Sequence, residues 1–161
     1  MIYRYVVIFA AALCSQSWVC ASDVTMTLPN STQQVKIPQV PVDPRELAGA
    51  LSEANRFLAA LTEGNLTRCY ELFGKPTKEQ MSKADWMSQS SVILTPLGPR
   101  IGAEFEAAIG TESIPNGPPD RYISIALRTQ FVRASVIETI TLNKSKEMWQ
   151  VVGYHVQRIE Q

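Results

Sequence analysis

The sequence predicts an α+β domain in which three N-terminal helices pack on a curved, four-stranded antiparallel sheet. This prediction depends on a change in the spacing of apolar residues along the sequence. Apolar residues recur every three or four positions from residue 43 to about residue 96, as in a helix, and at every second position after Pro99, as in a strand with one wet face. The sequence contains neither a parallel β–α–β pattern nor a glycine-rich phosphate loop. Helices followed by an antiparallel meander favour one α+β domain, and 161 residues suffice for one core.

Residues 1–21 have the three-part pattern of a cleavable secretory signal peptide. One positive charge, Arg4, precedes an apolar stretch over 5–13, and a more polar region then ends at Ala21, after which cleavage is expected. The apolar stretch is shorter than the roughly 20 residues that a bilayer-spanning helix needs. We therefore expect an exported protein, periplasmic or extracellular, with no membrane span after cleavage.

Cleavage leaves a chain with a single cysteine, Cys69, so we expect no internal disulfide. A lipid anchor is the alternative to free export, but neither Cys14 nor Cys20 follows the small residue that lipid modification needs. Residues 22–42 carry three prolines and short polar runs, which predict an extended or disordered lead. The single folded domain is then expected over 43–161.

The first helix is expected to begin at Asp43-Pro44, where the aspartate caps the helix and proline occupies its first turn. It ends near Gly64 and carries an apolar stripe at spacings of three and four. The stripe comprises Leu47, Leu51, Ala54, Leu58 and Leu61. A short second helix is expected over 65–73, and a third from Thr77 to Pro96.

The second half of the chain predicts four strands, over 101–108, 122–131, 135–142 and 148–158. The segment 113–120 is rich in proline, glycine, asparagine and aspartate, and it is expected to turn the chain between the first two strands. The last two strands are expected to form a hairpin around 143–147, with Leu142 opposite Trp149.

Charge and composition exclude several functions. Lysine plus arginine and aspartate plus glutamate both number 15, so there is no basic surplus to hold a nucleic-acid backbone. One histidine and few cysteines leave mainly carboxylates as metal ligands, and no acidic loop has the spacing that calcium needs. No cofactor, metal or nucleic-acid partner is therefore expected.

One acid/base pair can be built from the expected hairpin. Its register places Glu138 and His155 on one face of the sheet, a diagonal step of about 7 Å apart. A carboxylate beside an imidazole can abstract and return a proton, which makes these two the candidate catalytic residues. A slip of one residue would send the side chains to opposite faces, and a solvated or satisfied pair is the structural alternative.

Three aromatic residues, Trp86, Trp149 and Tyr154, are the candidate ligand contacts. One interpretation is that the tryptophans fill the core and that Tyr154 lies at its rim with a wet hydroxyl. The other is that the aromatic side chains line a cavity for an apolar ligand. The sequence pattern is compatible with both.

A set of motifs gives a resemblance to a known family. The motifs are Trp86, Pro96-Leu97-Gly98, 114–122, Phe131, 138–142 and 149–154. Taken together, these motifs span roughly residues 43–157, and over this range the chain resembles an exported bacterial family, domain of unknown function 4019. The resemblance implies a bacterial envelope protein with the cone-shaped fold of nuclear-transport-factor-like and cystatin-like proteins, and it implies no activity. Basic residues stand before and after the Leu-Gly turn in that family; here those places hold Leu94 and Ala103, with Arg100 as a displaced substitute.

The predicted function is that of a non-catalytic envelope module that binds a partner protein or a small apolar ligand, because the chain contains no convincing catalytic set. The alternative is a cofactor-free isomerase, dehydratase or hydrolase that uses Glu138 or His155 as a base inside the cone. Toxin-immunity and assembly-factor roles stay open. A homodimer through the outer sheet face is compatible with its pattern, in which Arg128 and Gln130 interrupt apolar residues.

Overall fold

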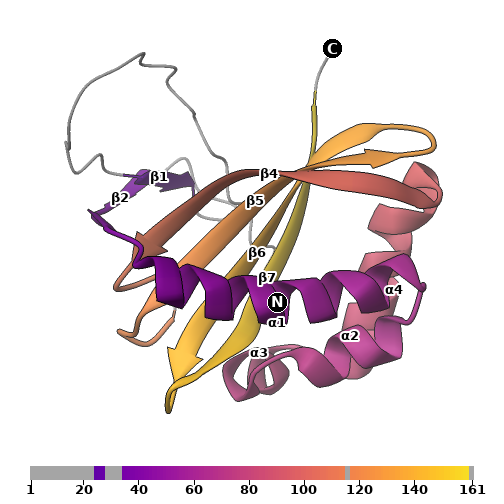
Figure 1. The fold of residues 1–161 in the computed structure, drawn as a ribbon. Helices are drawn as coiled ribbons and strands as arrows, with labels where there is room; N and C mark the ends of the chain where they lie inside the picture. The colour runs from indigo at the N-terminus through magenta and orange to yellow at the C-terminus, as the bar shows by residue number, and fades with distance from the viewer. Residues whose placement is uncertain (1–23, 28–33, 115–116, 160–161) are drawn as a thin grey trace, which may run out of the picture.

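The computed structural model describes residues 24–27, 34–114 and 117–159, which form four helices and two β-sheets. The helices are α1 (Pro44–Thr62), α2 (Leu66–Leu72), α3 (Lys75–Gln80) and α4 (Lys83–Leu94), and α4 continues into the 3₁₀ turn η1 (Thr95–Leu97). The main sheet is antiparallel in the order β3 (Gln39–Val40), β4 (Arg100–Thr111), β5 (Tyr122–Phe131), β6 (Ser135–Ser145) and β7 (Met148–Arg158). A separate pair joins β1 (Val24–Thr27) to β2 (Gln34–Ile37). The α+β fold class is confirmed (Figure 1).

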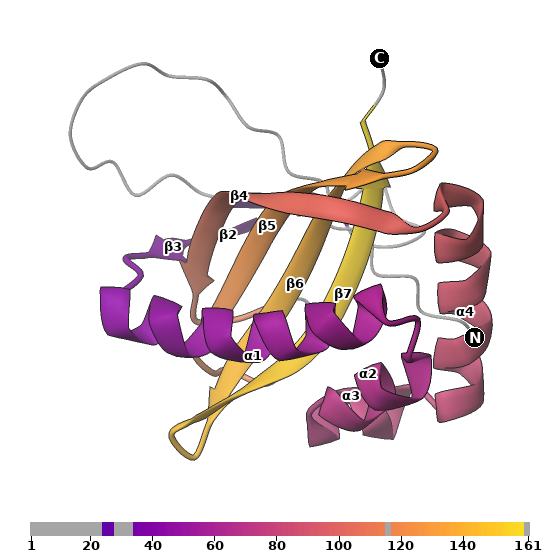
Figure 2. The same cartoon turned by 45° about the vertical axis from the view of Figure 1, so that its right-hand side comes forward.

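The main sheet curls into a half-barrel, and the helices lie on its concave side (Figure 2). Helix α1 crosses this side, whereas α2, α3 and α4 gather at one end of the sheet. Within the described part of the chain, no helix is both long and apolar enough to span a membrane. The expected signal peptide, 1–21, lies outside the described residues, and kinship with nuclear-transport-factor-like cones stays a prediction.

The expected lead, 22–42, contains the β1–β2 pair, and two further features, in the helices and in the main sheet, differ from those expected. The single helix expected from Thr77 to Pro96 is divided into α3 and α4, because Ser82 begins a new helix by accepting a hydrogen bond on its Oγ from the Asp85 backbone N–H, at 3.1 Å. The main sheet has five strands rather than four, because β3, from the expected lead, pairs with the last two residues of β4. Both differences extend the predicted plan without changing its class.

The β6–β7 hairpin has a different register from the expected one. Lys146 and Glu147 both adopt positive φ, 48° and 67°, which is the conformation of a two-residue hairpin turn. Trp149 therefore lies opposite Lys144, and Leu142 lies opposite Val151. The expected pairing of Leu142 with Trp149 is wrong because these non-glycine residues gave no sequence signal for so tight a turn.

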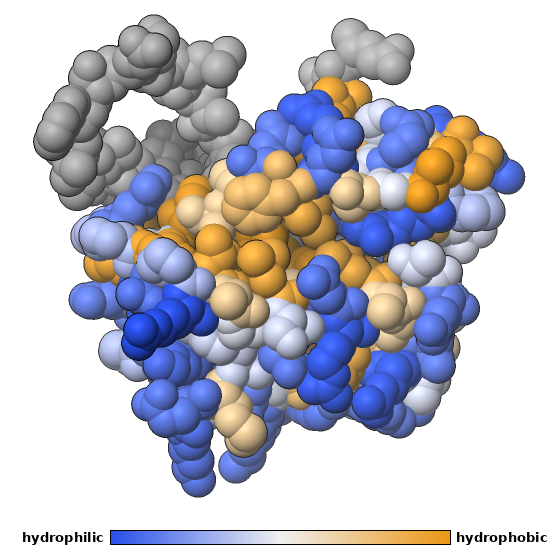
Figure 3. All heavy atoms as spheres, in the orientation of Figure 1, coloured by the Kyte–Doolittle hydropathy of each residue, from blue (hydrophilic) through white to orange (hydrophobic). Residues whose placement is uncertain are grey.

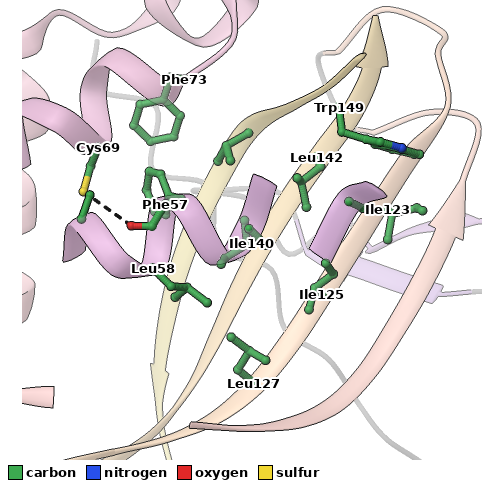
Figure 4. Close-up of a cluster of buried hydrophobic side chains, with 14 of the residues drawn as sticks. Phe57, Leu58, Cys69, Phe73, Ile123, Ile125, Leu127, Ile140, Leu142 and Trp149 are labelled. Carbon is green, nitrogen blue, oxygen red and sulfur yellow. Dashed lines mark hydrogen bonds between the residues drawn. The ribbon is translucent and has the colours of Figure 1, made fainter. Parts of the chain in front are cut away.

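The core lies between α1 and the concave face of the sheet (Figure 4). Asp43 caps α1 as expected, with its side chain accepting a hydrogen bond from the Arg45 backbone N–H at 2.8 Å. The buried face of α1 presents Phe57 and Leu58 to the sheet, and apolar residues at alternate positions of β5 and β6 meet them. These strand residues are Ile123, Ile125, Leu127, Ile140 and Leu142. Helix α1 thereby covers the middle of the sheet and leaves one end of the half-barrel to α4 and η1.

Candidate ligand-binding site

A carboxylate is buried on the concave face of the sheet. Glu138 lies in the middle of β6, and its two neighbours on this face, Val136 and Ile140, are apolar and fully buried. Glu138 itself is 0% exposed. A buried charge is costly unless it is paired and hydrogen-bonded, so its partners define what the site can do.

Glu138 accepts hydrogen bonds from three side chains on three other strands. Its Oε2 accepts from Arg100 Nη2 at 2.8 Å and from Arg100 Nε at 3.1 Å, and also from Thr129 Oγ1 through a short bond. Its Oε1 accepts from Tyr154 Oη at 2.6 Å. Strands β4, β5, β6 and β7 each contribute one of these four residues. We call this set, Arg100, Thr129, Glu138 and Tyr154, the carboxylate network.

Arg100 connects the network to solvent. It follows the turn at Gly98, whose φ of 76° favours glycine, and it begins β4. Its side chain is 13% exposed, against 1% for the Glu138 side chain. The remaining nitrogen, Nη1, reaches only Thr62 Oγ1, at the long distance of 3.5 Å. Arg100 therefore retains donor capacity toward the surface after neutralising Glu138.

Tyr154 is held as a neutral donor. Burial raises its pKa well above the usual 10, and the Glu138 charge and hydrogen bond raise it further, while Arg100 acts in the opposite direction. Its ring packs on Phe57 and Trp86, with centroid separations of 5.5 Å and 6.1 Å. The aromatic cluster thus fixes the hydroxyl that points at the carboxylate.

A hollow of about 390 Å³ opens above the carboxylate network at the end of the half-barrel. Its floor is formed by Arg100, Glu138 and Tyr154. Its walls come from the end of α1, the start of α2, the end of α4, η1, the turn at Gly98–Pro99 and the end of β5. The wall residues are Leu61, Thr62, Glu63, Gly64, Leu66, Ser91, Leu94, Thr95, Gly98, Pro99 and Phe131. We call this the α4 hollow; its volume is within the range of small-molecule sites, and it combines apolar walls with a polar floor.

The three aromatic candidates separate in the structure. Tyr154 lines the α4 hollow. Trp86 is 5% exposed and lies in the core, where its Nε1 donates to the Leu66 carbonyl at 2.9 Å. Trp149 is also buried, at the other end of the core, against Gly49. Only one of the three therefore borders a hollow that a ligand could enter.

The two acid/base candidates do not meet. A register shift between Thr141 and Leu142 moves the β6–β7 pairing by a further residue, so Glu138 lies opposite Val156 and His155 lies opposite Thr139. Because adjacent strand residues point to opposite faces, His155 lies on the convex side. Burial there lowers its pKa below the usual 6.5. The expected shared face is wrong, and His155 does not line the α4 hollow.

Sequence reasoning missed the roles of Arg100 and Thr129. A signal for Thr129 and Glu138 was present, since both stand at alternate positions where the strands otherwise carry buried apolar residues. Arg100 had no such signal because its partner is 38 positions away in the sequence. Among the described residues no group of three or more histidine, cysteine, aspartate or glutamate side chains could hold a metal ion.

Fold and site together define a class: an α+β half-barrel, closed on one side by helices, with an open hollow over a buried ion pair. The family described as Protein of unknown function (DUF4019) matches residues 53–154, more than half of the chain. The chain belongs to this family, and the resemblance drawn from its motifs is confirmed. The match contains Tyr154, Arg100, Thr129 and Glu138, and thus the whole network. No curated protein matches the chain.

Proposed function

We propose that the protein is an exported binding module of the bacterial envelope that holds one small amphipathic molecule in the α4 hollow. The signal-peptide pattern of residues 1–21 supports export. The observation that carries the binding proposal is the carboxylate network under an apolar hollow: Glu138 is hydrogen-bonded through both carboxylate oxygens, and Arg100 keeps donor capacity at Nη1. Pre-organised polar groups at the base of an apolar pocket are the usual way in which a site orients a ligand.

The chemistry of the α4 hollow favours a neutral head group. The Arg100 charge is already balanced by Glu138, and the carboxylate of Glu63 stands at the rim without an ion-pair partner among the described residues. An anionic ligand would therefore meet net negative charge. A carbonyl or hydroxyl oxygen can accept from Arg100 Nη1, while a hydrocarbon group packs on the Leu61, Leu94 and Phe131 side of the hollow.

The same network argues against acid–base catalysis at Glu138. Both carboxylate oxygens already accept hydrogen bonds, three on Oε2 and one on Oε1, and the residue is 0% exposed. A base must come within hydrogen-bond reach of the proton that it removes. Glu138 could do so only after releasing Tyr154 or Arg100, which would leave buried polar groups unpaired. This arrangement agrees better with a structural role for Glu138, in which its carboxylate positions the Arg100 side chain.

Titration with the neutral fluorophore N-phenyl-1-naphthylamine tests the proposal. Ser91 lines the α4 hollow and is exposed, so Ser91→Phe fills the hollow without altering the core. Ser88, on the same helix, is exposed and does not line the α4 hollow, which makes Ser88→Phe the matched control. We expect saturable fluorescence enhancement in the parent and in Ser88→Phe, and at least about tenfold weaker binding in Ser91→Phe, which corresponds to about 1.4 kcal/mol. Equal binding by both variants would refute the assignment of the α4 hollow.

The isomerase, dehydratase or hydrolase alternative makes a different prediction. If His155 acted as a base, His155→Ala would abolish turnover of a substrate while leaving the α4 hollow unchanged. On the binding proposal, His155→Ala leaves the affinity for the fluorophore unchanged, because His155 lies on the convex side of the sheet. If His155→Ala kept its fold but lost binding of the fluorophore, the binding proposal would be contradicted.

A further inference from the structure

A second apolar depression lies beside the α4 hollow, between α1 and β4. Its volume is about 610 Å³, and Figure 3 shows apolar atoms gathered there, above α1 and below β4 in that view. Apolar side chains form most of its surface: Leu51, Leu58, Ala59, Ala103, Phe105 and Leu127. Asn55 is its polar lining residue midway along α1, and Thr62, Glu63 and Arg100 end it where it meets the α4 hollow. We call it the β4 groove.

The β4 groove runs along a strand edge that has no partner. Within the described part of the chain, β3 pairs only with Gly110 and Thr111 of β4. The outer edge of 100–109 therefore presents backbone N–H and C=O groups to solvent, with irregularities at 100–102 and 105–107 and a regular stretch between them. Exposed strand edges pair readily with an added strand. The β3 contact shows that this edge accepts antiparallel pairing.

The two faces of β4 carry different chemistry. On the groove side, Phe105 is a large apolar side chain that is 53% exposed. On the convex side, Glu104 lies opposite Arg128 in the register, but Arg128 pairs with Glu106 instead, at 2.7 Å. Glu104 keeps no ion-pair partner among the described residues. A strand added beside β4 would therefore meet an apolar groove on one face and an unpaired carboxylate on the other.

We infer that the β4 edge binds an extended peptide segment of another protein in which apolar residues alternate with lysine or arginine. Its backbone pairs with the free edge of β4, as in β-strand addition. Its apolar side chains, two residues apart, enter the β4 groove beside Phe105, and its basic side chains lie on the convex face beside Glu104. Glu63 offers a second carboxylate at the end of the groove.

Charge disfavours a second copy of the chain as the occupant. Antiparallel pairing of two β4 edges brings the same face of each strand together, and this face carries Glu104 and Glu106. Unpaired Glu104 carboxylates of both copies would then approach one another, and like charges in cross-strand positions are destabilising. A basic partner strand removes this repulsion and gains an opposite-charge pair.

A fluorescently labelled decapeptide that alternates valine and lysine serves as the probe, and its anisotropy is measured with the purified protein. The matched comparison peptide alternates valine and glutamate. Glu104→Lys reverses the charge of an exposed, unpaired carboxylate, and Glu79→Lys makes the same charge reversal at an exposed site on α3, where Glu79 pairs with Lys75 at 3.5 Å. We expect the valine–lysine peptide to bind, the valine–glutamate peptide not to bind, and Glu104→Lys, unlike Glu79→Lys, to weaken binding about tenfold, because one cross-strand attraction becomes a repulsion.

Hydrogen exchange locates the bound peptide. Saturation with the valine–lysine peptide is expected to slow amide exchange within 100–109, and Ser91→Phe is expected to bind it with unchanged affinity, so this inference stands or fails independently of the α4 hollow. Equal affinity for both peptides, equal loss in both lysine variants, or protection that leaves 100–109 unchanged would overturn it. A dimer in sedimentation whose formation protects amides within 100–109 from exchange would also overturn it, because the occupant would then be a second copy.

Discussion

The buried ion pair between Arg100 and Glu138 should contribute far more to the free energy of unfolding than the exposed ion pair between Arg128 and Glu106. Replacing Arg100 by Met keeps an unbranched side chain but leaves the Glu138 carboxylate, 0% exposed, with only the Thr129 and Tyr154 hydroxyls as donors. Breaking a buried pair in this way costs about 3–5 kcal/mol. Arg128→Met is the matched control, because Arg128 and Glu106 form an ion pair of similar length whose side chains are 50% and 40% exposed. Loss of that exposed pair should cost at most about 1 kcal/mol.

A double-mutant cycle measures how much of this cost comes from the pair itself. Glu138→Gln alone leaves Arg100 without its counter-ion but with access to the α4 hollow, and should cost about 1–3 kcal/mol. In the double variant no unpaired charge remains, so its cost should fall at least about 2 kcal/mol below the sum of the two single costs. Urea unfolding followed by tryptophan fluorescence gives these free energies. Equal losses for Arg100→Met and Arg128→Met, or strict additivity in the cycle, would refute the reasoning.

Three further predictions concern positions outside the network. Burial raises the pKa of the Cys69 thiol to about 12, so the native protein produced without residues 1–21, and hence without Cys14 and Cys20, should not react with a thiol reagent at pH 8, whereas the urea-unfolded protein should react. Burial lowers the pKa of His155 below 6.5, so as the pH falls the unfolded chain binds a proton at this residue before the folded chain does. The free energy of unfolding should therefore keep its full value above pH 6.5 and decrease as the pH falls below 6.5. Urea unfolding between pH 5 and 7 measures this dependence, which His155→Gln should reduce. A Cβ at Gly49 would lie 2.8 Å from Trp149 Cδ1, so Gly49→Ala should lower stability by about 1–3 kcal/mol in thermal unfolding, whereas Gly102→Ala, with open space around it, serves as the control.

The fold was predictable where local chemistry and hydrophobic period agree. Asp43-Pro44 both caps and starts α1, and the alternation of residues 122–131 specified β5. The division of α3 from α4 at Ser82 was missed because a serine inside an apolar pattern is compatible with both a helix interior and a cap. The pairing of β3 with β4 was missed because a strand of two residues is too short to show a hydrophobic period.

The site was only partly predictable, because its residues meet through sheet register. Glu138 and Tyr154 were both singled out in the sequence, but as members of different candidate sites. Their contact depends on the tight turn at Lys146 and on the register shift near Leu142, neither of which composition or spacing indicates. The turn shifts the register by two residues, which keeps each side chain on its expected face. The shift near Leu142 adds one residue more, which moves His155 to the opposite face from Glu138, so Glu138 was assigned the wrong partner.

Native mass spectrometry of the protein purified from cells is the sharpest test of ligand binding in the α4 hollow. If the α4 hollow holds a small amphipathic molecule, gentle ionisation of the parent and of Ser88→Phe should show the protein together with an additional bound mass. Ser91→Phe, whose side chain occupies the hollow, should appear without that mass while remaining folded. The same bound mass in all three proteins would contradict the account.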